Sequence, residues 1–341
     1  MSTSTYTATL LLSPTPRKSP PAGGVEAPTV VDSTYITETI RDAFSAVCTK
    51  LYLNLLLDTW KPLSCTSLQT ATAVEVTIID PTPSGIQIRS LKGCYDLALF
   101  EYEYNVDVAL QRDTVFRKHK RLVVFDMDST LIEQEVIDEL AAFVGVKDKV
   151  AAITESAMRG ELDFTASLRS RAALLNGVPS TVFTTLKSNG TITFTPGAHS
   201  LCRALKKLGC KLAVLSGGFQ PLAEYVKSSL GLDYAYANTL EVSADGQSLT
   251  GVVLGDIVNA ERKAALLKEI AEKEGVDLRQ VVAVGDGAND LVMMREAGFG
   301  VAFNAKPKVQ EEAPSHINSR TLQDILYLFG FTAAEVEDLL N

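Results

Sequence analysis

Short runs of apolar residues recur along the chain, each bounded by polar or glycine-rich segments. Residues 122–125, 211–216 and 281–285 are the clearest of these runs, and each is followed by residues with a helical pattern. A short apolar run of this kind is typical of a strand that is buried on both faces of a parallel sheet. Because such runs alternate with helical patterns, the chain predicts an α/β fold with a doubly wound parallel sheet, including a further strand near residues 298–302.

A second pattern, with apolar residues three and four positions apart, fills the segment between the first strand and Pro196. It predicts four short helices punctuated by glycines. The predicted helices span residues 136–144, 147–158, 164–175 and 181–187. Helices inserted at this point can form a lid over the strand ends, so we expect a cap over about residues 133–195. Further on, residues 240–242 and 249–253 flank an Asp-Gly pair, which predicts a β-hairpin.

The N-terminal part, residues 1–112, has a different character. Residues 13–33 are rich in Pro, Ser, Thr and Gly, a composition that predicts a mobile segment. Around it we expect a strand at 6–12, a helix at 35–47, a strand at 75–79 and an extended segment at 96–108. These elements predict a small α/β module for regulation or dimerisation, followed by a second domain over residues 113–335.

Composition narrows the possible functions. The chain has 341 residues and 46% hydrophobic content, which suits about two domains with full cores. Residues 117–121 are basic, but a short cluster at a junction is typical of a solvated linker, and the net charge of −9 argues against nucleic acid as a partner. No apolar run is long enough to cross a membrane. The five cysteines include no C-x-x-C pair, which favours reduced thiols and a cytoplasmic location.

Two carboxylates directly follow the first buried strand. Asp126 and Asp128 lie two residues apart, so their side chains point to the same side of an extended chain and can face one ligand. A D-x-D pair is also common in solvated turns and helix caps. Its interpretation therefore depends on the segments that follow.

The next strand ends in a hydroxyl and two glycines, Ser216-Gly217-Gly218, before a helical pattern at residues 220–230. Small residues let backbone N–H groups approach an anion, and a helix N-terminus adds a favourable partial charge. This segment therefore predicts a phosphate site, with a plain strand-to-helix turn as the alternative.

The third strand leads into a glycine-rich acidic segment, Gly285-Asp286-Gly287-Ala288-Asn289-Asp290. Its G-x-G could suggest a dinucleotide site, but Asp286 between the glycines would repel a pyrophosphate. Carboxylate oxygens at Asp286 and Asp290 instead suit Mg²⁺. Lys263, in a predicted helix at residues 260–274, is a further candidate, although a single lysine on a helix is usually solvated.

These segments occur in the order F-D-M-D-S-T, S-G-G-F, Lys263, G-D-G-A-N-D, and with them the chain resembles the haloacid dehalogenase (HAD) superfamily of aspartate-nucleophile phosphatases. Within it, residues from about 117 to 331 are similar to the phosphoserine phosphatase family, including Glu135 and the segments 155–158 and 167–171. The resemblance implies Mg²⁺-dependent hydrolysis of O-phosphoserine, the last step of serine biosynthesis. It also implies a HAD-like sheet with an inserted cap, and an N-terminal domain that is sometimes ACT-like.

The same resemblance implies roles for individual residues. Asp126 is the nucleophile that forms an aspartyl-phosphate, Asp128 is the general acid and base, and Lys263 supplies a cation. The implied metal ligands are Asp126, Asp128, through a carbonyl near it, and Asp286. The implied substrate contacts are Glu135, Met158, Phe164, Arg171, Ser216, Gly217 and Asn289.

Selectivity requires partners for the ammonium and carboxylate groups of phosphoserine. Arg171 offers a planar fork for a carboxylate, and Glu135 an anion for the ammonium. Glu135 also fits a first-turn helix acid that stabilises the helix N-terminus. Arg169 and Arg171 cannot share one helix face, and the family resemblance favours Arg171. By spacing alone, Met158 and Phe164 are core residues.

Two other functions stay open at this point. A phosphotransferase, or a phosphatase for another small phosphomonoester, would use the same Asp126 and Mg²⁺, but Glu135 and Arg171 argue against it. A regulator that binds amino acids through the N-terminal module would not need the intact catalytic positions. We therefore expect a small-molecule substrate, neither nucleic acid nor membrane as a partner, and a homodimer as the assembly that the module could support.

Overall fold

The computed structural model describes residues 4–14, 33–50, 54–55, 60–80, 93–158 and 161–341. The chain forms two compact units. One is the continuous segment Arg121–Gly298, and the other combines Met1–Lys120 with Phe299–Asn341. The expected domain boundary near residue 112 stays a prediction. Most of the segment expected to be mobile, residues 13–33, lies outside the described residues.

The Arg121–Gly298 unit is built on a parallel sheet. Its central strand β6 (Leu122–Phe125) pairs with β10 (Val281–Gly285) on one side and with β7 (Lys211–Phe219) on the other, and β8 (Tyr234–Val242) follows β7. Every residue of β6 and β10 is buried, which explains why both strands are continuously apolar. The predicted parallel sheet is confirmed.

Helices connect these strands. They are α8 (Ala198–Lys207), α9 (Gln220–Leu230), α10 (Ala260–Lys273) and α11 (Leu291–Glu296), with the short turns η2 (Leu278–Gln280) and η3 (Ala288–Asp290). The side chain of Asn259 caps α10 by accepting a hydrogen bond from the Arg262 N–H. Since β6, β7 and β10 run in parallel, the residues that follow them meet at one edge of the sheet.

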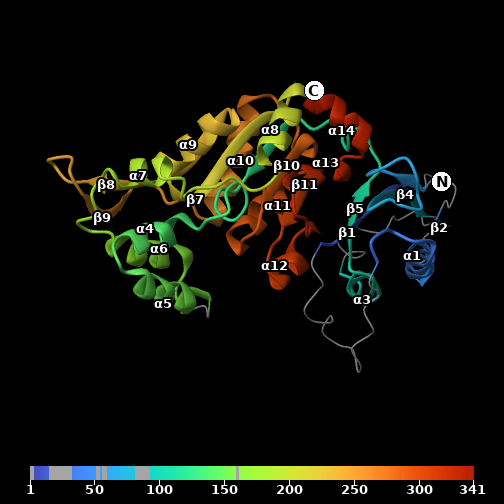
Figure 1. The fold of residues 1–341 in the computed structure, drawn as a ribbon, viewed down its shortest axis with the longest axis horizontal. Coiled ribbons are helices and arrows are strands. Elements are labelled where there is room, and N and C mark those ends of the chain that lie inside the picture. The colour runs from blue at the N-terminus through green and yellow to red at the C-terminus, as the bar shows by residue number, and fades with distance from the viewer. Residues whose placement is uncertain (1–3, 15–32, 51–53, 56–59, 81–92, 159–160) are drawn as a thin grey trace. The chain divides into compact units, whose positions relative to one another are not determined.

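The predicted hairpin is also present. β8 continues beyond its pairing with β7 and pairs antiparallel with β9 (Leu249–Leu254). Figure 1 shows this hairpin beside the cap helices. Its Gly251 has φ +80°, and a Cβ atom there would lie 3.0 Å from the Ala172 carbonyl oxygen of the cap. Glycine therefore permits both the backbone turn and the close packing of the hairpin on the cap.

Four helices form the cap, as the apolar spacing predicts. They are α4 (Val136–Phe143), α5 (Lys147–Met158), α6 (Phe164–Ala173) and α7 (Val182–Ser188). Their apolar faces are buried through residues such as Leu140, Val150 and Leu168, and this burial holds the helices together. Asp163 caps α6 by accepting a hydrogen bond from the Ala166 N–H.

The other unit contains an antiparallel sheet with the order β2-β4-β1-β5, in which β3 also pairs with β4. Its elements are β1 (Ser4–Leu12), α1 (Glu38–Lys50), β2 (Asn54–Leu55), β3 (Lys61–Pro62), β4 (Ala73–Asp80), α3 (Tyr95–Tyr104) and β5 (Val106–Arg112). Phe44 of α1 and Phe100 of α3 pack with ring centroids 5.5 Å apart in its core. The expected small α/β module is therefore present.

The prediction of an extended segment at residues 96–108 is wrong. This region is the helix α3, followed by the strand β5. Leu97 and Phe100 lie one helical turn apart and are both buried in the core of the module, and Asn105 ends the helix with φ 51°. Packing of these two side chains overrides the local alternation of apolar and polar residues that suggested a strand.

The C-terminal segment completes the same unit. It contains β11 (Phe299–Phe303), α12 (Pro307–Glu312), β12 (Ser315–Ile317), η4 (Leu322–Asp324), α13 (Ile325–Leu328) and α14 (Ala333–Leu340). Gln111 Nε2 donates to the Leu328 carbonyl oxygen at 2.7 Å, and Asn318 Nδ2 donates to Asp107 Oδ1 at 2.9 Å. Residues from both chain ends thus share one hydrogen-bonded structure.

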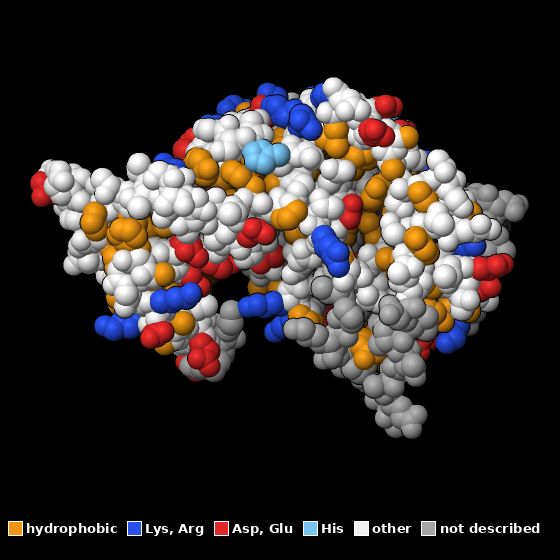
Figure 2. All heavy atoms as spheres, in the orientation of Figure 1, with side chains coloured by type: hydrophobic (Ala, Val, Ile, Leu, Met, Phe, Trp, Pro, Cys, Tyr) orange, Lys and Arg blue, Asp and Glu red, His pale blue; other side chains and the backbone are white. Residues whose placement is uncertain are grey.

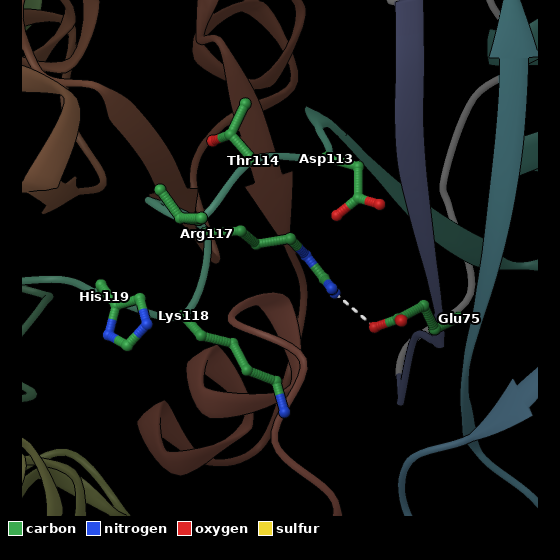
Figure 3. A pocket seen from close by; sticks show the side chains of 7 residues that line it. Glu75, Asp113, Thr114, Arg117, Lys118 and His119 are labelled. Atoms are coloured by element: carbon green, nitrogen blue, oxygen red, sulfur yellow. Dashed lines mark hydrogen bonds and ion pairs between the residues drawn. The ribbon is translucent and has the colours of Figure 1, made fainter.

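The basic segment at residues 117–121 is only partly a solvated linker. Arg117 and Lys120 are buried. Arg117 pairs with Glu75 beside a cavity of about 500 Å³ (Figure 3), and the Lys120 Nζ atom lies 5.6 Å from the centroid of the Phe299 ring. The expectation of a solvated linker is wrong for these two residues, because Arg117 forms a buried ion pair and Lys120 packs against an aromatic ring. Among the described residues, no helix combines the length and apolar character needed to cross a membrane.

Candidate active site

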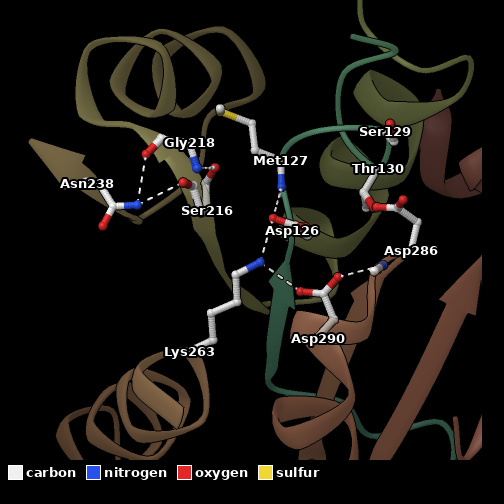
Figure 4. A network of polar contacts seen from close by, with 12 residues as sticks. Asp126, Met127, Ser129, Thr130, Ser216, Gly218, Asn238, Lys263, Asp286 and Asp290 are labelled. Carbon is white, nitrogen blue, oxygen red and sulfur yellow. Dashed lines mark hydrogen bonds and ion pairs between the residues drawn. The ribbon is translucent and has the colours of Figure 1, made fainter. Parts of the chain in front are cut away.

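A buried cation lies between two carboxylates at the carboxyl edge of the parallel sheet (Figure 4). The Lys263 Nζ atom is 2.8 Å from Asp126 Oδ1 and 2.7 Å from Asp290 Oδ1, and its side chain is fully buried. Burial alone would lower the pKa of Lys263, but the charges of Asp126 and Asp290 outweigh it and raise the pKa. Lys263 is therefore a charged member of the site and not a solvated helix residue.

The two carboxylates are also held by backbone groups. The Met127 N–H donates to Asp126 Oδ1 at 2.7 Å, and the Gly287 N–H donates to Asp290 Oδ2 at 3.0 Å. A Cβ atom at position 285 would overlap the Asp290 carboxylate. The glycine at the end of β10 therefore lets this acid reach Lys263.

Three carboxylates lie close enough to share one cation. Oxygen atoms of Asp126, Asp286 and Asp290 all lie within 4.8 Å of one another, and Thr130 Oγ1 donates to Asp286 Oδ1 at 3.1 Å. Burial, together with the negative charges of Asp126 and Asp290, raises the pKa of Asp286 to about 8. Hard carboxylate oxygens that repel one another in this way suit a divalent cation such as Mg²⁺.

Asp128 lies beside this cluster. Its residue is half-buried, and its Oδ1 atom is buried without a hydrogen-bond partner. Burial raises the pKa of Asp128 well above its usual range, and the charges of Glu135 and Asp126 add to the effect. An unpartnered buried oxygen is costly, so it fits a group that meets a proton, a metal or a substrate. The role of Asp128 as a metal ligand stays a prediction.

The Ser216-Gly217-Gly218 segment faces the same carboxylates. The Gly218 N–H donates to the buried Ser216 Oγ at 2.8 Å, and a Cβ atom at position 218 would lie 3.3 Å from Asp128 Oδ2. At position 217 a Cβ atom would lie 2.8 Å from the Phe164 ring and 3.8 Å from Asn289 Nδ2. The small residues thus form a close-fitting backbone surface between the acids, Asn289 and the cap.

Glu135 and Arg171 are brought to the same region from different cap helices. Glu135 is the N-cap residue of α4, its side chain is exposed, and its Oε1 accepts a hydrogen bond from Ser129 Oγ at 2.8 Å. Burial lowers the pKa of Arg171, whereas the charges of Glu135 and Asp138 raise it. The Arg171 contacts with Thr154 and Ser167 are long, at 3.5 and 3.4 Å, so they hold its guanidinium weakly.

The space-filling view in Figure 2 also shows acidic side chains near the cap. Acidic side chains gather along the hollow beside the cap helices (Figure 2). Arg169, in contrast to Arg171, is exposed. The side chain of Met158 lies outside the described residues. With that exception, the structure gathers the predicted site residues around one region of the Arg121–Gly298 unit.

Two buried polar residues of the site have no counterpart in the prediction. Thr130 is fully buried and orients Asp286; its position inside F-D-M-D-S-T is the sequence signal for a place in the site. Asn238 is also buried, and it donates to the carbonyl oxygens of Gly217 and Gly218. It lies in no motif, so only the folded structure shows its contacts.

Comparison with known proteins agrees with this geometry. The sequence profile of the haloacid dehalogenase-like hydrolases matches residues 120–298. The chain belongs to this hydrolase family. A probable phosphoserine phosphatase of Schizosaccharomyces pombe is 56% identical over 237 residues, which cover 70% of this chain and 79% of the relative. The phosphoserine phosphatase of Saccharomyces cerevisiae is 48% identical over 233 residues, covering 68% and 74% of the two chains.

Solved structures of HAD-family hydrolases resemble this one as well. One solved as a phospho-aspartyl intermediate analogue of phosphoserine phosphatase is 45% identical, with a TM-score of 0.56, and covers 62% of this chain and 99% of its own. A HAD family hydrolase from Salmonella enterica serovar Typhi is 27% identical, with a TM-score of 0.71. It covers 95% of this chain and 98% of its own, so the similarity extends into the N-terminal module.

Proposed function

We propose that this HAD-family hydrolase is a phosphoserine phosphatase that converts O-phosphoserine and water to serine and phosphate. The observation that carries the proposal is the cluster formed by Asp126, Asp128 and Lys263 at the end of β6, opposite the Ser216 segment. A phosphomonoester dianion repels a carboxylate nucleophile, since two unit charges about 4 Å apart interact by about 4 kcal/mol at an effective dielectric of about 20. Lys263 lies where it can offset this repulsion.

Asp126 is the proposed nucleophile. Its Oδ1 accepts hydrogen bonds from Lys263 and from the Met127 N–H, and Oδ2, which makes neither contact, attacks phosphorus. The new bond joins Asp126 to phosphorus as the bond from phosphorus to the serine oxygen breaks. The solved phospho-aspartyl intermediate analogue of a phosphoserine phosphatase supports this step.

Asp128 is the proposed proton carrier. In the first step it donates a proton to the departing serine oxygen. In the second, its carboxylate takes a proton from a water molecule, the water oxygen attacks phosphorus, and the bond to Asp126 breaks to release phosphate. Two observations support this role: the Oδ1 atom of Asp128 is buried without a hydrogen-bond partner, and its Oδ2 atom faces Gly218 of the Ser216 segment.

The phosphoryl oxygens would bind to three donors of this chain, namely the Ser216 hydroxyl, the Gly217 N–H and the Asn289 amide. We infer that Asp126 and Asp286, with the backbone carbonyl near Asp128, hold Mg²⁺. When bound, Mg²⁺ supplies positive charge that offsets the charges of the nucleophile and the phosphoryl group. The acids gathered around Asp286 support this assignment.

Recognition of the serine part is assigned to the cap. The Arg171 guanidinium would bind the carboxylate and Glu135 the ammonium group, while Phe164 and Met158 cover the short apolar stem. Closure of the cap would exclude water during attack by Asp126. The placement of Phe164 against Gly217 supports such a cover.

We also infer a cytoplasmic location and a homodimer that pairs through the N-terminal module. All five cysteines are free thiols, as is typical of reducing compartments. β2 lies at one end of the module's antiparallel sheet and pairs there with β4, whereas β5, at the other end, is buried; the pairing is therefore assigned to the β2 side.

Phosphate release from a panel of phosphomonoesters, measured with Mg²⁺ and with excess EDTA, tests the proposed function. O-phosphoserine is expected to give the largest kcat/KM, and EDTA should abolish turnover. A clear preference for a different phosphomonoester would assign the same chemistry to another substrate. Turnover that is unaffected by EDTA would overturn the metal assignment.

A further inference from the structure

The Ser216 segment interrupts the pairing of two neighbouring strands. Leu215 of β7 lies opposite Tyr236 of β8, but the next pair joins Phe219 to Asn238. Four steps along β7 therefore correspond to two along β8, which makes the Ser216-Gly217-Gly218 segment a bulge. Within a bulge, backbone groups lose their ladder partners and need others.

Asn238 supplies these partners with its side chain. Its Nδ2 atom donates to the carbonyl oxygens of Gly217 at 2.8 Å and Gly218 at 3.2 Å, and its Oδ1 accepts from the Val258 N–H at 2.8 Å. Only 1% of the residue is exposed, so water does not compete for these bonds. The amide thus connects the bulge to the segment that leads into α10, the helix that carries Lys263.

The orientation of one peptide group links Asn238 to the Ser216 hydroxyl. In a trans peptide the C=O and N–H point in opposite directions. When the Gly217 carbonyl points to Asn238, the Gly218 N–H must point away from it, and this N–H donates to Ser216 Oγ at 2.8 Å. Because Ser216 Oγ already accepts a hydrogen bond, its own hydrogen is available to donate to a phosphoryl oxygen. Hydrogen bonds in such a chain polarise one another.

We propose that Asn238 is a positioning residue that sets the donor direction of the Ser216-Gly217-Gly218 bulge and thereby the affinity of the site for phosphate. It acts through the bulge and does not touch the substrate. The inference rests on the proposed phosphatase function, since it assigns the phosphoryl group to this bulge. Substitution of Asn238 should therefore weaken phosphate binding without affecting the carboxylates that hold Mg²⁺.

The test compares Asn238→Ala with Gln220→Ala in the full-length protein. Gln220 is a matched control because its side-chain amide also donates to a backbone carbonyl oxygen, that of Ala235, and accepts from a backbone N–H, that of Ala237. It makes no hydrogen bond to the carbonyl oxygens of the bulge. Inhibition by inorganic phosphate is measured at saturating Mg²⁺, with O-phosphoserine and with p-nitrophenyl phosphate as substrates. The Mg²⁺ concentration for half-maximal activity is measured in parallel.

For Asn238→Ala we expect the inhibition constant of phosphate to rise about tenfold and kcat/KM to fall at least as much for both substrates. The Mg²⁺ requirement should change less than about twofold, and Gln220→Ala should match the wild type. Asn238→Ser keeps one short donor, so its phosphate inhibition constant and kcat/KM should lie between those of the wild type and Asn238→Ala. It tests the proposal if Asn238→Ala fails to fold.

Wild-type phosphate affinity in the Asn238 variants, or an equal loss in Gln220→Ala, would overturn the positioning role. A parallel loss of Mg²⁺ affinity would do the same, because it indicates general damage. A wild-type protein without phosphatase activity would instead contradict the proposed function, so the two failures are distinguishable.

Discussion

Lys263 is fully buried, although a lone lysine on an amphipathic helix ordinarily faces water. Its ammonium group is neutralised by Asp126 and Asp290 at 2.8 and 2.7 Å. Removing one partner of a buried ion pair leaves an uncompensated charge and is strongly destabilising. The lysine and its two acids therefore form one unit, and truncation of any of these three side chains affects both charge and fold.

Asp126→Asn tests the nucleophile with the least structural change. The amide oxygen can still accept from the Met127 N–H and Lys263, but it cannot form the aspartyl-phosphate. We expect kcat to fall by about 10⁴ or more, while near-ultraviolet circular dichroism remains that of the wild type. The variant should also fail to acquire the beryllofluoride or acid-labile phosphate adduct that the wild type forms. Retained turnover in a folded variant would exclude Asp126 as the nucleophile.

Asp128 predicts a particular pH dependence. In its proposed role it acts as an acid in its protonated form, and burial raises its pKa above the usual range. The wild type should therefore keep its activity above the pKa of an ordinary aspartate and lose kcat/KM as the pH rises through the pKa of Asp128. Asp128→Asn should lower kcat/KM by about 10²–10⁴ and remove this decline. If the variant shows the same decline, a different group is the acid.

At the scale of helices and strands, the proposed roles assign selectivity to the cap and phosphoryl chemistry to the edge of the sheet. Arg171→Ala should reduce kcat/KM for O-phosphoserine by about 10²-fold, because the substrate carboxylate would lack its charged partner. The kcat/KM for p-nitrophenyl phosphate, which has no carboxylate, should change little. Arg169→Ala is the matched control, since Arg169 is exposed on the same helix, and should affect neither substrate. Unchanged O-phosphoserine turnover in Arg171→Ala would contradict the assignment.

The sequence predicts elements best where burial and local pattern agree. β6 lies on residues 122–125, α5 on residues 147–158 and α9 on residues 220–230, as expected from their apolar spacing. The prediction is wrong for α3, where aromatic residues alternate with polar ones and only packing against Phe44 reveals the helix. Local pattern carries no information on such distant contacts.

The residues of the site also divide into those that the sequence pattern predicts and those that only the folded structure reveals. Asp126 and Asp286 follow apolar strands, and Ser216 comes directly after the apolar run of β7, so their meeting at one sheet edge could be inferred from strand order. Thr130 and Asn238 contribute through hydrogen bonds to other residues. Whether an asparagine lies opposite a bulge depends on strand register, and no short motif specifies that register.

At the scale of the whole molecule, stability and metal binding are linked through the acidic cluster. The pKa of Asp286 is about 8 in the folded state and has a reference value of 3.8. Because the folded state holds this proton more tightly, its stabilising effect is complete below about pH 4 and is lost as the pH rises through about 8. Without metal, the wild type should therefore have a lower melting temperature at pH 8 than at pH 6.

Asp286→Asn should reduce this pH dependence and raise the melting temperature of the metal-free protein at pH 8. A difference of several degrees is expected, since each kcal/mol shifts Tm by about 2–4 °C in domains of about 150–250 residues. Added Mg²⁺ should stabilise the wild type more than the variant. Differential scanning calorimetry in EDTA and in Mg²⁺ measures both effects. Equal stabilisation of the two proteins by Mg²⁺ would argue against Asp286 as a ligand.

The assignment of both chain ends to one compact unit has a consequence for biosynthesis. The continuous Arg121–Gly298 segment holds the whole catalytic cluster and can begin to fold on the ribosome as soon as it has emerged. The N-terminal module has its core within its own residues, but its Gln111 and Asp107 side chains find their partners only in Leu328 and Asn318. Until translation reaches these two residues, both side chains lack those partners, so the module can complete its contacts only after the Arg121–Gly298 segment has been made.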